Sequence, residues 1–156
     1  MKIIDNRKRA KITGKGKLPP FLALERRMIE SREWAALPAR ALKLLIEIGA
    51  QLRGHNNGDL SIPWSKMKRR GFRSPETLNR ARRDLIDAGF IVQTRHGGLH
   101  QCSLYAVTWQ PVHECNGKLE VAAERFPSHA WRKSQALYEN RTDKLTTNTK
   151  TVPIAA

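Results

Sequence analysis

Residues 64–109 read WSKMKRRGFRSPETLNRARRDLIDAGFIVQTRHGGLHQCSLYAVTW, and the order of helix, turn and strand signals in this stretch decides the fold. The first seven residues, 64–70, can form one or two helical turns, with Trp64 and Met67 facing inward and the basic side chains mostly outward. Residues 71–73, Gly-Phe-Arg, then form a turn. The stretch therefore begins with a short basic helix that ends in a tight turn.

A second helix follows, and the sequence marks both of its ends. Ser74 is a favourable N-cap and Pro75 suits the first helical position, while Gly89 supplies the left-handed residue that commonly follows a helix end. Helical spacing predicts an apolar side made of Leu78, Ala81, the stem of Arg82, Leu85 and Ile86. The opposite, exposed side carries Glu76, Arg80, Arg83 and Asp87, with Asn79 on its flank.

Two strands complete the stretch. Residues 90–95 form the first strand, residues 96–101 a loop that contains two glycines, and residues 102–109 the returning strand. Together with the two helices, this order predicts a mainly α fold with a small antiparallel β-sheet, specifically a winged helix-turn-helix. That scaffold places one helix in a groove of DNA.

The flanking sequence suggests three parts. Residues 1–20 lack an apolar period and are predicted to be a flexible basic arm, residues 21–111 the winged-helix domain, and residues 112–156 a C-terminal extension. Within the domain we also expect a short amphipathic helix over 21–30, an apolar core helix over 38–53 and a brief strand over 59–62.

The C-terminal extension has weaker signals. Helical patterns over residues 119–125 and 131–138 predict that it is partly helical. The Thr-, Asn- and Lys-rich end from Asn140 is then expected to be flexible.

The charge of the chain is strongly positive and unevenly placed. Twenty-nine Lys and Arg residues stand against 14 acids, a net charge of +15. Residues 1–20 hold seven bases and one acid, and residues 64–96 hold nine bases and three acids. A field of this sign draws the chain toward polyanions, so nucleic acid is the first candidate partner.

Composition excludes several other classes. The chain has two cysteines, no apolar run near the ~20 residues that span a bilayer, and no signal-peptide core, so we expect a reduced, cytoplasmic protein that does not enter a membrane. Aromatic residues make up 6%, which disfavours a single-strand binder built on base stacking. Neither clustered carboxylates nor a Tyr nucleophile beside paired His residues appear, so we predict no enzyme, no cofactor and no small-molecule substrate.

The predicted DNA-binding residues fall into three groups. Asn79 and Arg80 are the first candidates for base contacts in the major groove, and Thr77 and Arg83 suit either bases or phosphates. The residues expected to contact phosphates around the first helix and the turn are Lys66, Lys68, Arg69, Arg70, Arg73 and Ser74. At the hairpin, a neighbouring minor groove or phosphate is within reach of Arg95, His96 and His100.

Three motifs carry a family resemblance: the "NNG" turn before the first strand, the "DLIDAGFI" helix end, and the "GG" hairpin that runs into a Trp-ended strand. Over residues 21–111 the chain resembles small winged-helix proteins of phages and integrated mobile elements. It is similar to the DNA-binding region of phage replication protein O and plasmid replication initiators. The resemblance implies binding to operator or origin DNA, often as a homodimer, in transcription regulation or in replication.

Two alternatives stay open at this point. His96, His100, Cys102, His113 and Cys115 fall within 20 residues and offer zinc ligands, although their spacing matches no paired or finger pattern, so we predict no metal site. The second alternative is a protein-interaction module that blocks or recruits a host complex, because winged helices also serve in that way.

Overall fold

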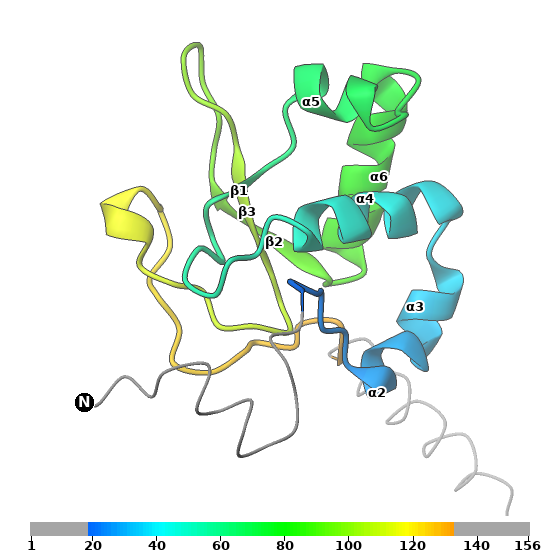
Figure 1. Cartoon of the computed structure of the whole chain (residues 1–156), viewed down its shortest axis with the longest axis horizontal. Helices are drawn as coiled ribbons and strands as arrows, with labels where there is room; N and C mark the ends of the chain where they lie inside the picture. The colour runs from blue at the N-terminus through cyan, green and yellow to red at the C-terminus, as the bar shows by residue number, and fades with distance from the viewer. Residues whose placement is uncertain (1–18, 133–156) are drawn as a thin grey trace, which may run out of the picture.

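The computed structural model describes residues 19–132 (Figure 1). This part of the chain holds five α-helices and one three-stranded antiparallel sheet, as the mainly α prediction with a small sheet requires. All but the last two residues of the predicted basic arm, and the predicted flexible end, lie outside the described residues. None of the helices between residues 19 and 132 has the length and apolar content needed to cross a membrane.

The N-terminal part of the domain contains α2 (Arg26–Ile29), α3 (Arg32–Ala36) and α4 (Ala39–Gly49). The helix predicted over residues 21–30 is shorter than expected, because residues 21–25 are not helical and Leu22 packs against Gly49. Ser31 starts a separate helix instead, since its hydroxyl accepts from the Trp34 amide at 3.2 Å and donates to the Met28 carbonyl at 2.7 Å.

The core helix α4 also ends earlier than residue 53. The Asn56 side chain donates to the Gln51 carbonyl at 2.8 Å and accepts from the Arg53 amide at 2.7 Å. Side-chain bonds of this kind satisfy backbone groups that a longer helix would otherwise pair, so the chain turns here.

The two central helices confirm the local signals. α5 spans Trp64–Arg69 and α6 spans Pro75–Asp87, with Ser74 as the N-cap of α6. Gly89 takes φ +76°, and a Cβ there would lie 2.7 Å from the backbone at Trp131, so both conformation and space favour glycine.

The sheet has the order β1-β3-β2, with β3 (Leu104–Val107) in the centre. β1 (Leu60–Ser61) and β2 (Ile91–Arg95) pair with its two edges in antiparallel fashion. The strands of the hairpin are shorter than predicted, because regular pairing ends at Arg95 and Leu104. The hairpin loop is therefore residues 96–103.

Asn57 extends the β1 edge of the sheet with its side chain. Its amide Oδ1 accepts from the Val107 N–H at 2.8 Å, and its Nδ2 donates to the Val107 carbonyl at 3.0 Å. The same Nδ2 contacts the carbonyls of Gln110 and Pro111 at 2.9 and 3.0 Å. A buried amide thus takes the place of a strand partner beyond the end of β1.

The core lies between the helices and one face of the sheet. It includes Leu44 from α4, Leu85 from α6, and Tyr105, Val107 and Trp109 from β3 and its extension. Leu104 and Ala106, on the opposite face of β3, are also buried. The segment after Pro111 runs on that side of the sheet, away from the helices (Figure 1).

The helix predicted over residues 119–125 is wrong. The Glu120 amide donates to the Thr94 carbonyl of β2 at 2.9 Å, and the Glu124 amide donates to the Val112 carbonyl at 2.8 Å. These bonds hold the segment in a non-helical path beside the sheet, and the helical element that precedes it is only the short 3₁₀ turn η1 (Cys115–Gly117). Most of the helix predicted over 131–138 lies outside the described residues.

The same segment returns to the core at Trp131, which is 2% exposed. Its ring stacks on the Phe90 ring with centroids 6.3 Å apart. The Trp34 ring also contacts Phe90, edge-on, with centroids 5.9 Å apart. The C-terminal segment therefore contributes to the packing of the domain as well as covering the sheet.

Candidate nucleic-acid interface

Helix α6 is held by its apolar side and presents the other side to solvent. Leu78, Ala81 and Leu85 are buried, as the helical spacing predicts. An ion pair between Arg40 of α4 and Asp84 of α6, at 2.9 Å, flanks this packing. The predicted base-contacting residues Asn79, Arg80 and Arg83 are all exposed.

Arg80 is not a free cation. Its guanidinium lies 2.5 Å from the Glu76 carboxylate one helical turn earlier, and both side chains are well exposed. An exposed pair at this spacing contributes only about 0.3–0.5 kcal/mol, so a stronger partner can displace the carboxylate. Sequence reasoning placed both residues on one side of the helix and did not pair them.

The predicted phosphate-contacting bases cluster on α5 and the turn after it. Lys66, Lys68, Arg69 and Arg73 are exposed. Arg69 donates back to the Ser65 carbonyl of its own helix at 3.3 Å. Arg70 is also exposed but forms a 2.7 Å ion pair from its Nε to Glu47 of α4. That pair links the end of α5 to α4.

Ser74 and Thr77 act together at the start of α6. The Ser74 hydroxyl accepts from the Thr77 amide at 3.1 Å and lies 2.9 Å from the Thr77 hydroxyl. Both side chains are half-buried. Their observed role is to cap the helix, which fixes the orientation of its exposed side.

The hairpin residues differ in how they are held. Arg95 is half-buried and donates to the Cys102 carbonyl across the hairpin at 3.1 Å. His96 is exposed, and its Nδ1 lies 2.9 Å from a Glu120 oxygen that also accepts from the His96 amide. These bonds lower the pKa of Glu120 below its usual value. His100 is exposed near the tip of the loop.

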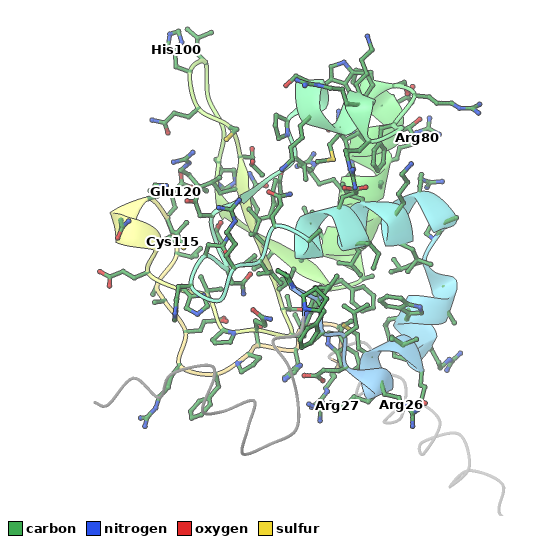
Figure 2. The ribbon with its side chains drawn as sticks, in the orientation of Figure 1. Arg26, Arg27, Arg80, His100, Cys115 and Glu120 are labelled. Atoms are coloured by element: carbon green, nitrogen blue, oxygen red, sulfur yellow. The ribbon has the colours of Figure 1, made fainter. Side chains whose placement is uncertain are left out.

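These groups meet at one end of the molecule. Figure 2 shows His100 at the tip of the hairpin and Arg80 on α6 toward the same end, whereas Arg26 and Arg27 lie at the opposite end. Figure 1 places α5 at that end as well. α5, the start of α6 and the hairpin loop therefore lie at the same end of the molecule, with a space between helix and hairpin.

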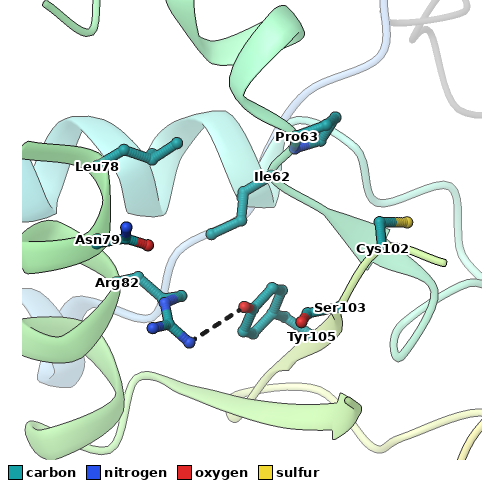
Figure 3. A pocket seen from close by; sticks show the side chains of 8 residues that line it. All are labelled: Ile62, Pro63, Leu78, Asn79, Arg82, Cys102, Ser103 and Tyr105. Carbon is teal, nitrogen blue, oxygen red and sulfur yellow. Dashed lines mark hydrogen bonds between the residues drawn. The ribbon is translucent and has the colours of Figure 1, made fainter. Parts of the chain in front are cut away.

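A groove of about 280 Å³ lies in that space, between α6 and the foot of the hairpin (Figure 3). We call it the α6–hairpin groove, and its lining residues are Ile62, Pro63, Leu78, Asn79, Arg82, Cys102, Ser103 and Tyr105. Asn79 is the one predicted site residue among them. Sequence reasoning placed Arg82 on the apolar side for its stem and missed that its guanidinium reaches into this groove.

The residues considered for zinc do not converge. No group of three or more His, Cys, Asp or Glu side chains within residues 19–132 is arranged to hold a metal ion. His113 accepts from the Asn57 amide through Nδ1 at 3.2 Å, while His96 is bound to Glu120. Cys115 is half-buried, and burial raises the pKa of its thiol. His113 and Cys115 both contact the backbone of Asn57, whereas His96 contacts Glu120.

Comparison of the chain with protein-family models, with curated proteins and with solved structures found no match.

Proposed function

We propose that this domain is a winged helix-turn-helix that binds double-stranded DNA. The observation that carries the proposal is the arrangement of α5, the turn and α6, followed by the β2–β3 hairpin, with exposed bases of all three at one end of the molecule. The β2–β3 hairpin lies beside α6, with residues of both lining one groove, and this arrangement supports the proposal.

In this proposal α6 enters the major groove. Arg80 suits a bidentate contact to guanine and Asn79 a contact to adenine, with Arg83 beside them. To contact DNA, Arg80 must leave the Glu76 carboxylate, so the net gain in binding free energy from this contact is limited. The loss of that ion pair is offset only by a well-matched base edge, which adds to discrimination between bases.

The remaining bases supply affinity without sequence choice. Lys66, Lys68, Arg69 and Arg73 lie where the first helix and the turn cross the phosphate backbone. His100 on the hairpin loop reaches toward the neighbouring minor groove. The net charge of +15 steers the protein to DNA and makes binding strongly salt-dependent.

The biological role we propose is a transcriptional regulator or a replication-origin-binding protein of a phage, plasmid or integrated mobile element, acting as a homodimer in the cytoplasm. This role rests on the motifs quoted for the family resemblance. We propose no catalytic step, cofactor or small-molecule substrate.

The test starts with selection of preferred duplexes from a random pool, with the mass of the complex measured to give its stoichiometry. Arg80→Ala is then compared with Lys68→Ala on the selected duplex and on random DNA. Arg80→Ala should lower the preference for the selected site by about 1–3 kcal/mol, whereas Lys68→Ala should weaken binding to all sequences alike.

Two outcomes would contradict the proposal at different levels. Equal losses for Arg80→Ala on selected and random DNA would remove α6 from base recognition. Absence of duplex binding even at low salt would contradict DNA binding itself and leave the protein-interaction module as the better proposal.

A further inference from the structure

We propose that the α6–hairpin groove holds one phosphate of the DNA backbone, bound by Arg82 together with the hydroxyls of Ser103 and Tyr105. This inference rests on the proposed function, since it assigns a contact within the same complex. It adds a binding site between helix and hairpin that the sequence did not indicate.

Arg82 has no acidic partner among the described residues, unlike three other arginines of the domain. Arg40, Arg70 and Arg80 each pair with a carboxylate within 3 Å. For Arg82, no carboxylate of residues 19–132 lies within 4.0 Å, and its one hydrogen bond is a long contact of 3.5 Å to the Tyr105 hydroxyl. Its Nε is buried and has no partner among the described residues. A guanidinium presents five N–H donors, so most of its hydrogen-bonding capacity is unused.

The two hydroxyls in the groove are also available as donors. The Ser103 oxygen accepts from the Gly97 amide at 3.0 Å and from the Gln93 side chain at 3.4 Å, which leaves its own proton free to donate. The Tyr105 oxygen accepts from Arg82, and its proton is likewise not used by another described group. Figure 3 shows the Arg82 guanidinium facing the Tyr105 hydroxyl, with Ser103 on the same side of the groove as Tyr105.

The lining selects for an anion. It includes no acidic side chain, and Asn79 adds an amide at the edge. Ile62, Pro63 and Leu78 provide apolar walls that reduce contact with water, so the attraction between the guanidinium and an anion is stronger than at an open surface. Charge-assisted bonds to phosphate oxygens suit this set of donors.

Position identifies the anion as a backbone phosphate. One strand of the sugar-phosphate backbone separates the major groove of a duplex from the neighbouring minor groove. If α6 occupies the first and the hairpin loop reaches the second, that strand passes between them, which is where the α6–hairpin groove opens.

The experiment compares three variants on the selected duplex. Arg82→Met keeps a long side chain and removes the guanidinium, and Tyr105→Phe removes one hydroxyl with little change in packing. Arg26→Met is the matched control, because Arg26 is highly exposed and lies at the opposite end of the domain. Melting temperatures establish that each variant is folded, and Tyr105→Phe carries the test if Arg82→Met is not.

Arg82→Met should raise Kd about tenfold to a hundredfold, the range for a charge-assisted hydrogen bond, and lower the slope of log K against log salt by about 0.9. Tyr105→Phe should raise Kd about twofold to tenfold, as expected for a neutral hydrogen bond. Arg26→Met should change Kd by less than about twofold, since an exposed charge far from the interface is screened.

A scan of duplexes with a single neutral methylphosphonate then locates the contact. One backbone position should weaken wild-type binding and leave the binding of Arg82→Met unchanged. Wild-type affinity in folded Arg82→Met, or the absence of any such position, would overturn this inference and leave the proposed function intact. Failure of the wild-type chain to bind any duplex would overturn both.

Discussion

Substitution of Asn57 tests whether its buried side-chain amide holds the sheet to the segment that follows the sheet. Asn57→Ala removes an acceptor for the Val107 N–H and donors to three carbonyls, all at a side chain that is 0% exposed. An amide has only two N–H donors, so the change removes three full hydrogen bonds rather than four.

The magnitude follows from this count. Three bonds at about 1 kcal/mol each give a loss of about 3 kcal/mol in the free energy of unfolding. The Val107 N–H, left buried without a partner, adds up to about 3 kcal/mol, so we expect a total loss of about 3–6 kcal/mol. Domains of this size are stable by about 5–15 kcal/mol, so the variant should be close to unfolding at room temperature.

The measurement is urea unfolding followed by tryptophan fluorescence, with Asn56→Ala as the matched control. Asn56 also makes two side-chain bonds, but it is half-buried in a surface turn, so water can replace them. Its loss should be about 1 kcal/mol.

Asn57→Asp gives an independent check through pH. The carboxylate keeps the acceptor but turns an oxygen toward carbonyl oxygens, which burial and repulsion make unfavourable for the charged form. The pKa of this Asp should therefore be raised in the folded state, and the variant should gain stability as the pH falls, before acid unfolding begins. A loss below about 1 kcal/mol for Asn57→Ala, or wild-type stability of Asn57→Asp at pH 7, would contradict the role of the amide.

Three further predictions concern the helix face, the C-terminal segment and pH. Glu76→Gln should lower Kd for duplex DNA about twofold to tenfold at low salt, because it frees Arg80 and removes a negative charge from the face; unchanged affinity would place Arg80 outside the interface. Trp131→Ala should cost about 3–5 kcal/mol in urea unfolding, whereas a loss below about 1 kcal/mol would mean that the C-terminal segment does not support the core. Burial lowers the pKa of His129 below its ordinary 6.5 against an opposing attraction from Glu25, so the unfolded chain binds that proton more readily and stability should fall as the pH drops below 6.5. His129→Asn, which suits the left-handed backbone there, should flatten this part of the pH profile, and an unchanged profile would assign the slope to other groups.

The parts of the fold that the sequence predicted are those with local causes. Ser74, Pro75 and Gly89 fix the ends of α6 through capping, a preset φ angle and a left-handed residue, each of which acts over a few residues. The spacing of Leu78, Ala81 and Leu85 then determines the buried side. These signals do not depend on the rest of the chain.

The parts that were missed depend on distant partners. Residues 119–125 have a weak helical pattern, but the open edge of β2 offers the Thr94 carbonyl to the Glu120 amide and draws the segment into a non-helical path. The role of Asn57 also depends on distant partners, because an "NNG" turn indicates only a break after a helix. Its partners at Val107 and beyond lie about 50 residues later, so no local pattern indicates them.

The candidate site shows the same difference between local and distant causes. The basic residues are visible in the sequence, but the acids that pair with some of them lie far away along the chain. The sequence shows a cluster of bases between residues 64 and 96, and a helical wheel separates exposed from buried positions. It does not show that Arg70 is paired with Glu47 of α4, or that Arg82 lies beside the hairpin with no carboxylate of residues 19–132 within ion-pair distance. An arginine already held by a carboxylate gives less to a phosphate than one whose donors are unused, because the first must break a pair to bind. The two residues therefore differ in expected contribution by more than their exposure suggests. Arg82, which the helical pattern assigned to packing, becomes a stronger candidate for an anion contact than the more exposed Arg70.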